Sequence, residues 1–95
     1  MTELDVVCHT AFDGWNCQVT ISDDDGTRTE HGVSVTRTER ERYAPASDVH
    51  LLVNASVRFL LSKEPKESIL RSFALSDIDR YFPDYPAAIA ARLRD

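Results

Sequence analysis

Alternating apolar and polar side chains around two Asp-Gly dipeptides characterise residues 1–37, and no other feature of the chain constrains its fold as strongly. Alternation with a period of two is typical of strands that bury one face. An Asp-Gly dipeptide between two such stretches is a strong hairpin signal, because tight hairpin turns favour residues that adopt positive φ. The pattern predicts a three-stranded antiparallel β-meander over residues 1–37.

The first turn sets the expected pairing of the first two strands. If Asp13 and Gly14 form a two-residue loop, Phe12 lies opposite Trp15. This register collects most apolar side chains on one face, and a slip of one residue would invert the two faces. The side chains expected on this inner face are Val6, Cys8, Phe12, Trp15, Cys17, Val19 and Ile21.

The same register determines what is expected of the cysteines. Cys17 lies opposite Thr10 and Cys8 lies opposite Val19, so the two thiols are diagonal neighbours and a disulfide is not expected. Both side chains face inward, where they are predicted to pack as small apolar groups. A nucleophilic cysteine needs exposure and a neighbouring base, so no catalytic role is predicted for either.

The second turn is interpreted as a three-residue loop at residues 24–26. This loop places Cys17 opposite Val33 and Val19 opposite His31, which keeps the valines on the inner face. The last residue of such a loop adopts the left-handed region, where glycine is favourable. The aspartates are then turn residues. A calcium loop is the weaker alternative, because the glycine comes too early for an EF-hand.

The histidines show no pattern of metal ligands. His9 falls on the outer face of the meander, and His50 falls in the first turn of the next helix, where it could cap or pair locally. His31 shares the inner face with Cys17, but no third ligand accompanies them. His31 is expected either at the rim of the sheet or hydrogen-bonded beneath a helix. No metal and no cofactor are expected.

Residues 38–46 are interpreted as a linker to a helical half. Their alternating charges continue the last strand or leave it as a solvated edge, and Pro45 ends it. Ser47 or Asp48 can cap a helix that runs to about Ser62. The apolar stripe of this helix comprises Val49, Leu52, Val53, Val57, Leu60 and Leu61.

Shorter helices are predicted after this one. Pro65 ends the long helix and opens a short one over residues 65–73. Ser76 and Asp79 resemble a capping box, which predicts that another short helix begins at Ser76. Residues 86–94 are predicted to form the last helix.

The predicted fold class is α+β. One domain spans residues 1–95, with the β-meander in residues 1–37, the linker in 38–46 and the helical part in 47–94. The long amphipathic helix is expected to cover one face of the sheet, and two or three short helices follow it, in a two-layer sandwich. A chain of this length can bury one modest core.

The stretch FLLSKEPKESILRSFALSDIDRYFPDYP, residues 59–86, resembles a family of small prokaryotic proteins. Members of that family carry a β-rich half followed by a helix that runs into the pattern FLLEREP-ESILRSFDLS-I-RYFPEY. The family has no assigned activity, so the resemblance implies no catalytic or binding residues. Ala74 stands where the pattern has an acidic residue, which puts the role of that acid in doubt in this chain.

Charge and hydropathy narrow the possible partners and locations. The formal net charge is −5 at pH 7. An acidic chain repels phosphate backbones, so nucleic acid is disfavoured as a partner. No apolar run approaches the ~20 residues of a membrane span, and the N-terminus lacks the features of a secretory signal. The predicted location is the cytoplasm, where cysteines stay reduced.

The candidate functional feature is a surface of arginine and aromatic side chains in the helical half. Arginine and tyrosine often anchor protein interfaces. The alternative is that the aromatic side chains of this half pack in the core of the domain. No catalytic constellation is readable, so no enzyme is predicted. The favoured function is a non-enzymatic module that binds another protein or itself; the alternatives are a nucleic-acid-binding domain of β-β-β-α type and a small-ligand carrier or enzyme. The expected interaction surface comprises Arg58, Arg71, Arg80, Tyr81 and Tyr85.

Overall fold

The fold of residues 2–94 is described by a computed structural model and belongs to the α+β class. The strands are β1 (Glu3–Ala11), β2 (Gly14–Ser22), β3 (Arg28–Thr36) and β4 (Ser72–Ala74). The helices are α1 (Arg37–Tyr43), α2 (Val49–Lys63), α3 (Leu75–Tyr81) and α4 (Tyr85–Leu93), with a short 3-10 helix, η1 (Lys66–Ser68), after α2.

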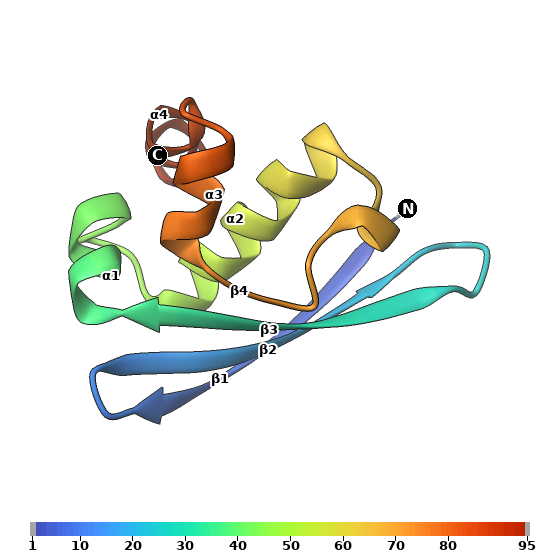
Figure 1. The fold of residues 1–95 in the computed structure, drawn as a ribbon, viewed down its shortest axis with the longest axis horizontal. Coiled ribbons are helices and arrows are strands. Elements are labelled where there is room, and N and C mark those ends of the chain that lie inside the picture. Colours follow the sequence, from blue (N-terminus) through green and yellow to red (C-terminus); the bar gives the residue numbers. More distant parts are fainter. Residues whose placement is uncertain (1, 95) are drawn as a thin grey trace.

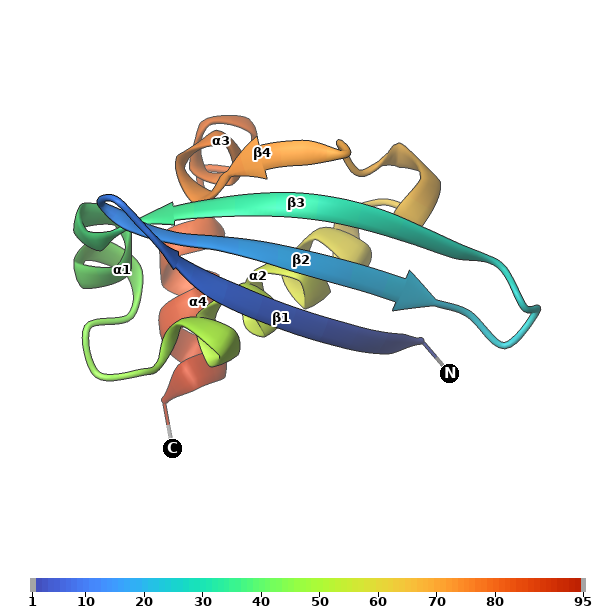
Figure 2. The ribbon, with the colours of Figure 1, turned by 90° about the horizontal axis from the view of Figure 1, so that it is seen from below.

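The strands form one mixed sheet in the order β1-β2-β3-β4. The first three are antiparallel, as predicted, and β4 runs parallel to β3, which the alternation pattern does not predict. The helices lie on one side of the sheet, and α4 packs on α2 farther from the strands (Figure 1). Seen from below, the other face of the sheet is open (Figure 2).

The second hairpin has the predicted register. Cys17 pairs with Val33 and Val19 pairs with His31. Gly26 ends the three-residue loop with a φ of 87°, so the prediction of a left-handed glycine is confirmed. The inner face of these two strands is buried, and its buried residues are Cys17, Val19, Ile21, His31, Val33 and Val35.

The first hairpin differs from the predicted register by two residues. Phe12 and Asp13 form the loop, and Ala11 lies opposite Gly14. Gly14 has a φ of 150°, and a Cβ atom there would lie 2.0 Å from the carbonyl oxygen of Val35. The glycine therefore permits a close approach of β3 and is not the second residue of the turn. The side chain of Phe12 is 104% exposed, so its predicted place on the inner face is wrong.

This shift brings the two cysteines together. Cys8 pairs directly with Cys17, their Cα atoms are 4.0 Å apart, and the side chains form a disulfide. The prediction of two reduced, diagonal cysteines is wrong. A shift of two residues leaves every strand side chain on its original face. Both cysteines therefore face inward in the predicted and in the observed register. Only the residues opposite them on the neighbouring strand differ.

Helix α1 replaces the predicted linker at residues 38–46. The hydroxyl of Thr36 accepts the N–H of Glu39 at 3.0 Å, and the Glu39 carboxylate accepts the N–H of Thr36 at 2.8 Å. This reciprocal arrangement is a capping box. The same carboxylate accepts the N–H of Ser76 at 2.9 Å. Glu39 therefore ties the start of α1 to the start of α3.

Helix α2 begins at the predicted cap. The Asp48 carboxylate accepts the N–H of Leu51 at 3.1 Å. The helix predicted over residues 65–73 is wrong, because the chain forms only η1 there before it joins the sheet as β4. The N–H of Gly32 donates to the carbonyl of Arg71 at 2.6 Å, so the edge of β3 holds this segment in an extended form. Across residues 2–94, no helix is long and apolar enough to cross a membrane.

Helix α3 is capped at a different residue from the one predicted. Ala74 is its N-cap, not Ser76, and the N–H of Ala74 donates to the Asp77 carboxylate at 3.0 Å. Alanine has no side-chain oxygen that could accept a hydrogen bond from the first turn.

Replacing Ala74 with serine is expected to raise the free energy of unfolding by about 1 kcal/mol, because the serine hydroxyl can cap the helix. Aspartate at the same position should stabilise the protein less, since Glu39 and Asp77 already place carboxylates on this turn and like charges repel. Urea unfolding of the three proteins measures both differences. A serine variant no more stable than the parent would contradict this role for residue 74.

Candidate functional site

An apolar pocket of about 350 Å³ opens between the end of α2, the segment around η1 and β4, and α3. Core side chains form its floor and exposed side chains form its rim. Two carboxylates lie among the lining residues. The lining residues are Leu60, Glu64, Ser68, Ile69, Leu70, Phe73, Asp77, Ile78, Tyr81 and Phe82.

The rim of the pocket exposes large apolar groups to water. Tyr81 is 70% exposed and Leu70 is 56% exposed, whereas the floor residues Ile69, Phe73 and Ile78 are buried. Covering apolar surface releases roughly 25 cal/mol for each Å² removed from water. A concave floor with an exposed apolar rim is therefore suited to binding a complementary apolar group.

The two carboxylates give this rim a negative charge. Asp77 is already engaged, because it accepts the N–H of Ala74 and lies 3.6 Å from the Arg80 guanidinium. Glu64 is half-buried, and among residues 2–94 its carboxylate has no hydrogen-bond or ion-pair partner. A cationic group of a ligand could pair with Glu64 without displacing an existing contact.

A buried lysine fixes one wall of the pocket. Lys66 is 4% exposed, and its Nζ donates to the Asp23 carboxylate at 2.5 Å, to the Thr27 hydroxyl at 2.7 Å and to the Glu67 carboxylate at 2.7 Å. These contacts join η1 to the loop between β2 and β3. The hydrogen bond from Lys66 lowers the pKa of Asp23 and raises that of the lysine, so both stay charged at neutral pH.

A buried histidine fixes the next part of the same wall. His31 is 2% exposed, and its Nδ1 lies 2.7 Å from the carbonyl oxygen of Leu70. A carbonyl only accepts, so Nδ1 carries the proton of this hydrogen bond. The Nε2 atom lies 2.8 Å from the hydroxyl of Thr29. Of the two places predicted for His31, the hydrogen-bonded one is observed, but its partner is the segment before β4 and not a helix.

The structure separates the residues of the predicted interaction surface. Tyr81 is exposed and lines the pocket. Arg80 and Arg71 are exposed nearby in sequence, and Arg58 is exposed on α2, where its Nε donates to Asn54 at 3.3 Å. Tyr85 is 0% exposed, so its assignment to a surface is wrong and it belongs to the core. Tyr81 alone of these residues is common to the prediction and the pocket.

Four of the ten lining residues lie in residues 65–73, where local sequence patterns predict a helix; they are Ser68, Ile69, Leu70 and Phe73. In a helix Leu70 and Ile69 would point in different directions from those in the observed extended segment. One signal was available in the sequence. The run ESILRSF places three bulky apolar residues within a short stretch, which is also consistent with an extended edge segment.

Comparisons with protein-family models, with curated proteins and with solved structures find no match for this chain. The resemblance of residues 59–86 to a prokaryotic family therefore stays a prediction. The pocket residues all fall within that stretch.

Proposed function

We propose that this protein is a non-enzymatic interaction module that binds a segment of a partner protein by taking one apolar side chain into the pocket. The observation that carries this proposal is the open apolar pocket with Leu70 and Tyr81 exposed on its rim. Exposed apolar groups around a concavity are typical of surfaces that a partner covers. Tyrosine is also among the residues that contribute most to binding energy at such surfaces.

The size and charge of the pocket favour a basic peptide segment as the occupant. A volume of about 350 Å³ is at the lower end of the range for ligand pockets and suits one anchoring side chain. The carboxylate of Glu64, which has no partner within residues 2–94, and the net charge of −5 both attract cations. The segment that fits best has a leucine or aromatic residue next to a lysine or arginine.

The contacts of the pocket wall support a preformed site. Lys66 and His31, whose side chains are buried, hold the segment around Leu70 against the sheet through their hydrogen bonds. A wall that is ordered before binding loses less conformational freedom when a partner arrives. The pocket should therefore bind without a prior rearrangement of η1 or β4.

Nucleic-acid binding is the less favoured function. The open face of the sheet is formed by β1, β2 and β3, and the only lysine or arginine in these three strands is Arg28, at the first position of β3. Binding of a phosphate backbone depends on such cations. A small-ligand carrier would use the same pocket as a peptide, and the experiment below distinguishes the two.

Random peptides displayed on phage and selected against the protein should converge on an apolar residue flanked by lysine or arginine. Fluorescence anisotropy of a synthetic consensus peptide should show that Leu70→Ala and Tyr81→Ala each weaken binding by about tenfold, or about 1.4 kcal/mol. Glu64→Gln should weaken binding and reduce its dependence on salt, because it removes the charge that attracts the basic residue.

Leu51→Ala is the matched control. Leu51 is 55% exposed, close to the 56% of Leu70, but lies outside the pocket, so this variant should bind the peptide as the parent does. Failure to enrich any sequence would favour the small-ligand function. Enriched peptides that bind equally well to the Leu70 and Tyr81 variants would overturn the assignment of the pocket. Light scattering across concentration tests whether a second copy is the occupant.

A further inference from the structure

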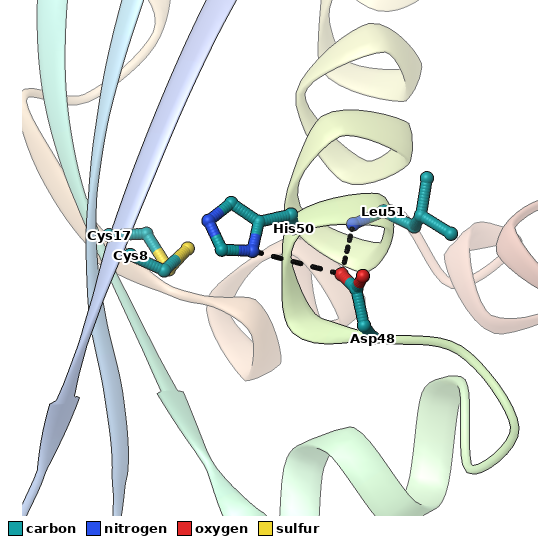
Figure 3. Close-up of a disulfide and its surroundings, with 5 residues drawn as sticks. All are labelled: Cys8, Cys17, Asp48, His50 and Leu51. Carbon is teal, nitrogen blue, oxygen red and sulfur yellow. Dashed lines mark hydrogen bonds and ion pairs between the residues drawn. A yellow bond between two sulfur atoms is a disulfide. The ribbon is translucent and has the colours of Figure 1, made fainter.

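A histidine lies beside the Cys8–Cys17 disulfide. His50, in the first turn of α2, extends toward the two sulfur atoms, and Asp48 lies on the other side of its ring (Figure 3). The Nδ1 atom of His50 is 3.8 Å from the Asp48 carboxylate. That carboxylate is held by the N–H of Leu51 at 3.1 Å. The His50 imidazole thus lies between the Asp48 carboxylate and the two sulfur atoms of the Cys8–Cys17 disulfide.

The two cysteine residues differ in their exposure to solvent. Cys17 is 2% exposed on the inner strand β2, whereas Cys8 is half-buried on β1, which is an edge of the sheet. The side chain of His50 is 53% exposed to solvent. A thiol from outside can therefore approach Cys8 but not Cys17. These features match what a reactive cysteine needs, namely partial exposure and a neighbouring group that can carry positive charge.

We propose that Cys8 and Cys17 form a redox-active pair that exchanges with external thiols, with Cys8 as the reacting sulfur and His50 as the group that stabilises its thiolate. The co-reactant is a low-molecular-weight thiol or a partner protein's dithiol. This activity is independent of the peptide-binding pocket. It also reconciles a disulfide with the predicted cytoplasmic location, where disulfides are usually transient and catalytic or redox-sensing.

The exchange proceeds in two balanced steps. An external thiolate attacks Sγ of Cys8, a bond forms between these two sulfurs, and the Cys8–Cys17 bond breaks. The electron pair leaves on Cys17, which takes a proton from solvent. A second external thiolate then attacks the external sulfur of the mixed disulfide and releases Cys8 as a thiolate beside His50. Two external thiols become one disulfide, and the protein disulfide becomes a dithiol; an external disulfide reverses the sequence.

The variant Cys17→Ser isolates Cys8 for a direct test. Its reaction with 5,5′-dithiobis(2-nitrobenzoate) near neutral pH, followed by absorbance, should be about tenfold faster than that of free glutathione. Adding His50→Gln should slow the reaction about fivefold, because the thiolate loses its neighbouring imidazole. His9→Gln is the matched control, since His9 is exposed and adjacent to Cys8 in sequence but lies on the opposite face of β1.

A rate equal to that of glutathione, or an equal effect of the two histidine substitutions, would overturn the proposal. If Cys17→Ser does not fold, as judged by circular dichroism, the parent protein supplies the test. Its native disulfide should then be reduced by glutathione without denaturant, and His50→Gln should change the rate of that reduction. A disulfide that is reduced only when the protein unfolds would show a purely structural bond.

Discussion

Replacing Tyr85 with alanine is expected to lower the free energy of unfolding by about 3–5 kcal/mol. The ring is 0% exposed and makes edge contacts with Tyr43 and Phe59, whose centroids lie 5.0 and 5.5 Å away. It joins α4 to α1 and α2, so its loss leaves a cavity where three helices meet. A small domain has only about 5–15 kcal/mol of stability in total. Urea unfolding followed by circular dichroism measures the change.

Tyr85→Phe is the control for this cavity. The Tyr85 hydroxyl lies 2.7 Å from the Ser56 hydroxyl, which in turn donates to the carbonyl of Leu52 at 2.7 Å. Phenylalanine keeps the ring and removes only one end of this buried chain, so a loss of about 1 kcal/mol is expected. Equal losses for the alanine and phenylalanine variants would mean that the hydroxyl, and not the packing of the ring, carries the stability.

Reduction of the disulfide is expected to lower the free energy of unfolding by about 2–3 kcal/mol. Cys8 and Cys17 are nine residues apart in sequence, and a bond that closes so short a loop restricts the unfolded chain only moderately. The reduced cysteines remain on the inner face of a paired hairpin, so the folded state should survive. Urea unfolding with and without a phosphine reductant gives the difference.

The double variant Cys8→Ala, Cys17→Ala is the control for the reductant. It should unfold at the same urea concentration with and without phosphine, and close to the reduced parent protein. A parent protein whose midpoint does not move on reduction would contradict the stabilising role of the bond. That result would leave the exchange rates of Cys8, which test the redox proposal, as a separate measurement.

The pocket shows what local signals miss. Residues 65–73 begin with a proline suited to a first helical turn, and local rules predict a helix. The observed extended form depends on His31 and Gly32, which bond the carbonyls of Leu70 and Arg71 from a distant strand. Helix α1 was missed for a different reason. Thr36 was assigned to the meander and Glu39 to the linker, so the Thr-x-x-Glu capping box that these two residues form was not recognised.

The alternation along residues 1–37 was sufficient to determine the meander and the face on which each strand side chain lies, because the side-chain period of a strand is two. It could not choose between registers that differ by two residues, since both keep the same faces. In the tertiary structure Gly14 pairs with Ala11 on one side and with Thr36 on the other, so it is part of β2 and not of the turn. The disulfide and the pocket wall beside β3 both depend on such contacts between distant segments, which local sequence patterns do not encode.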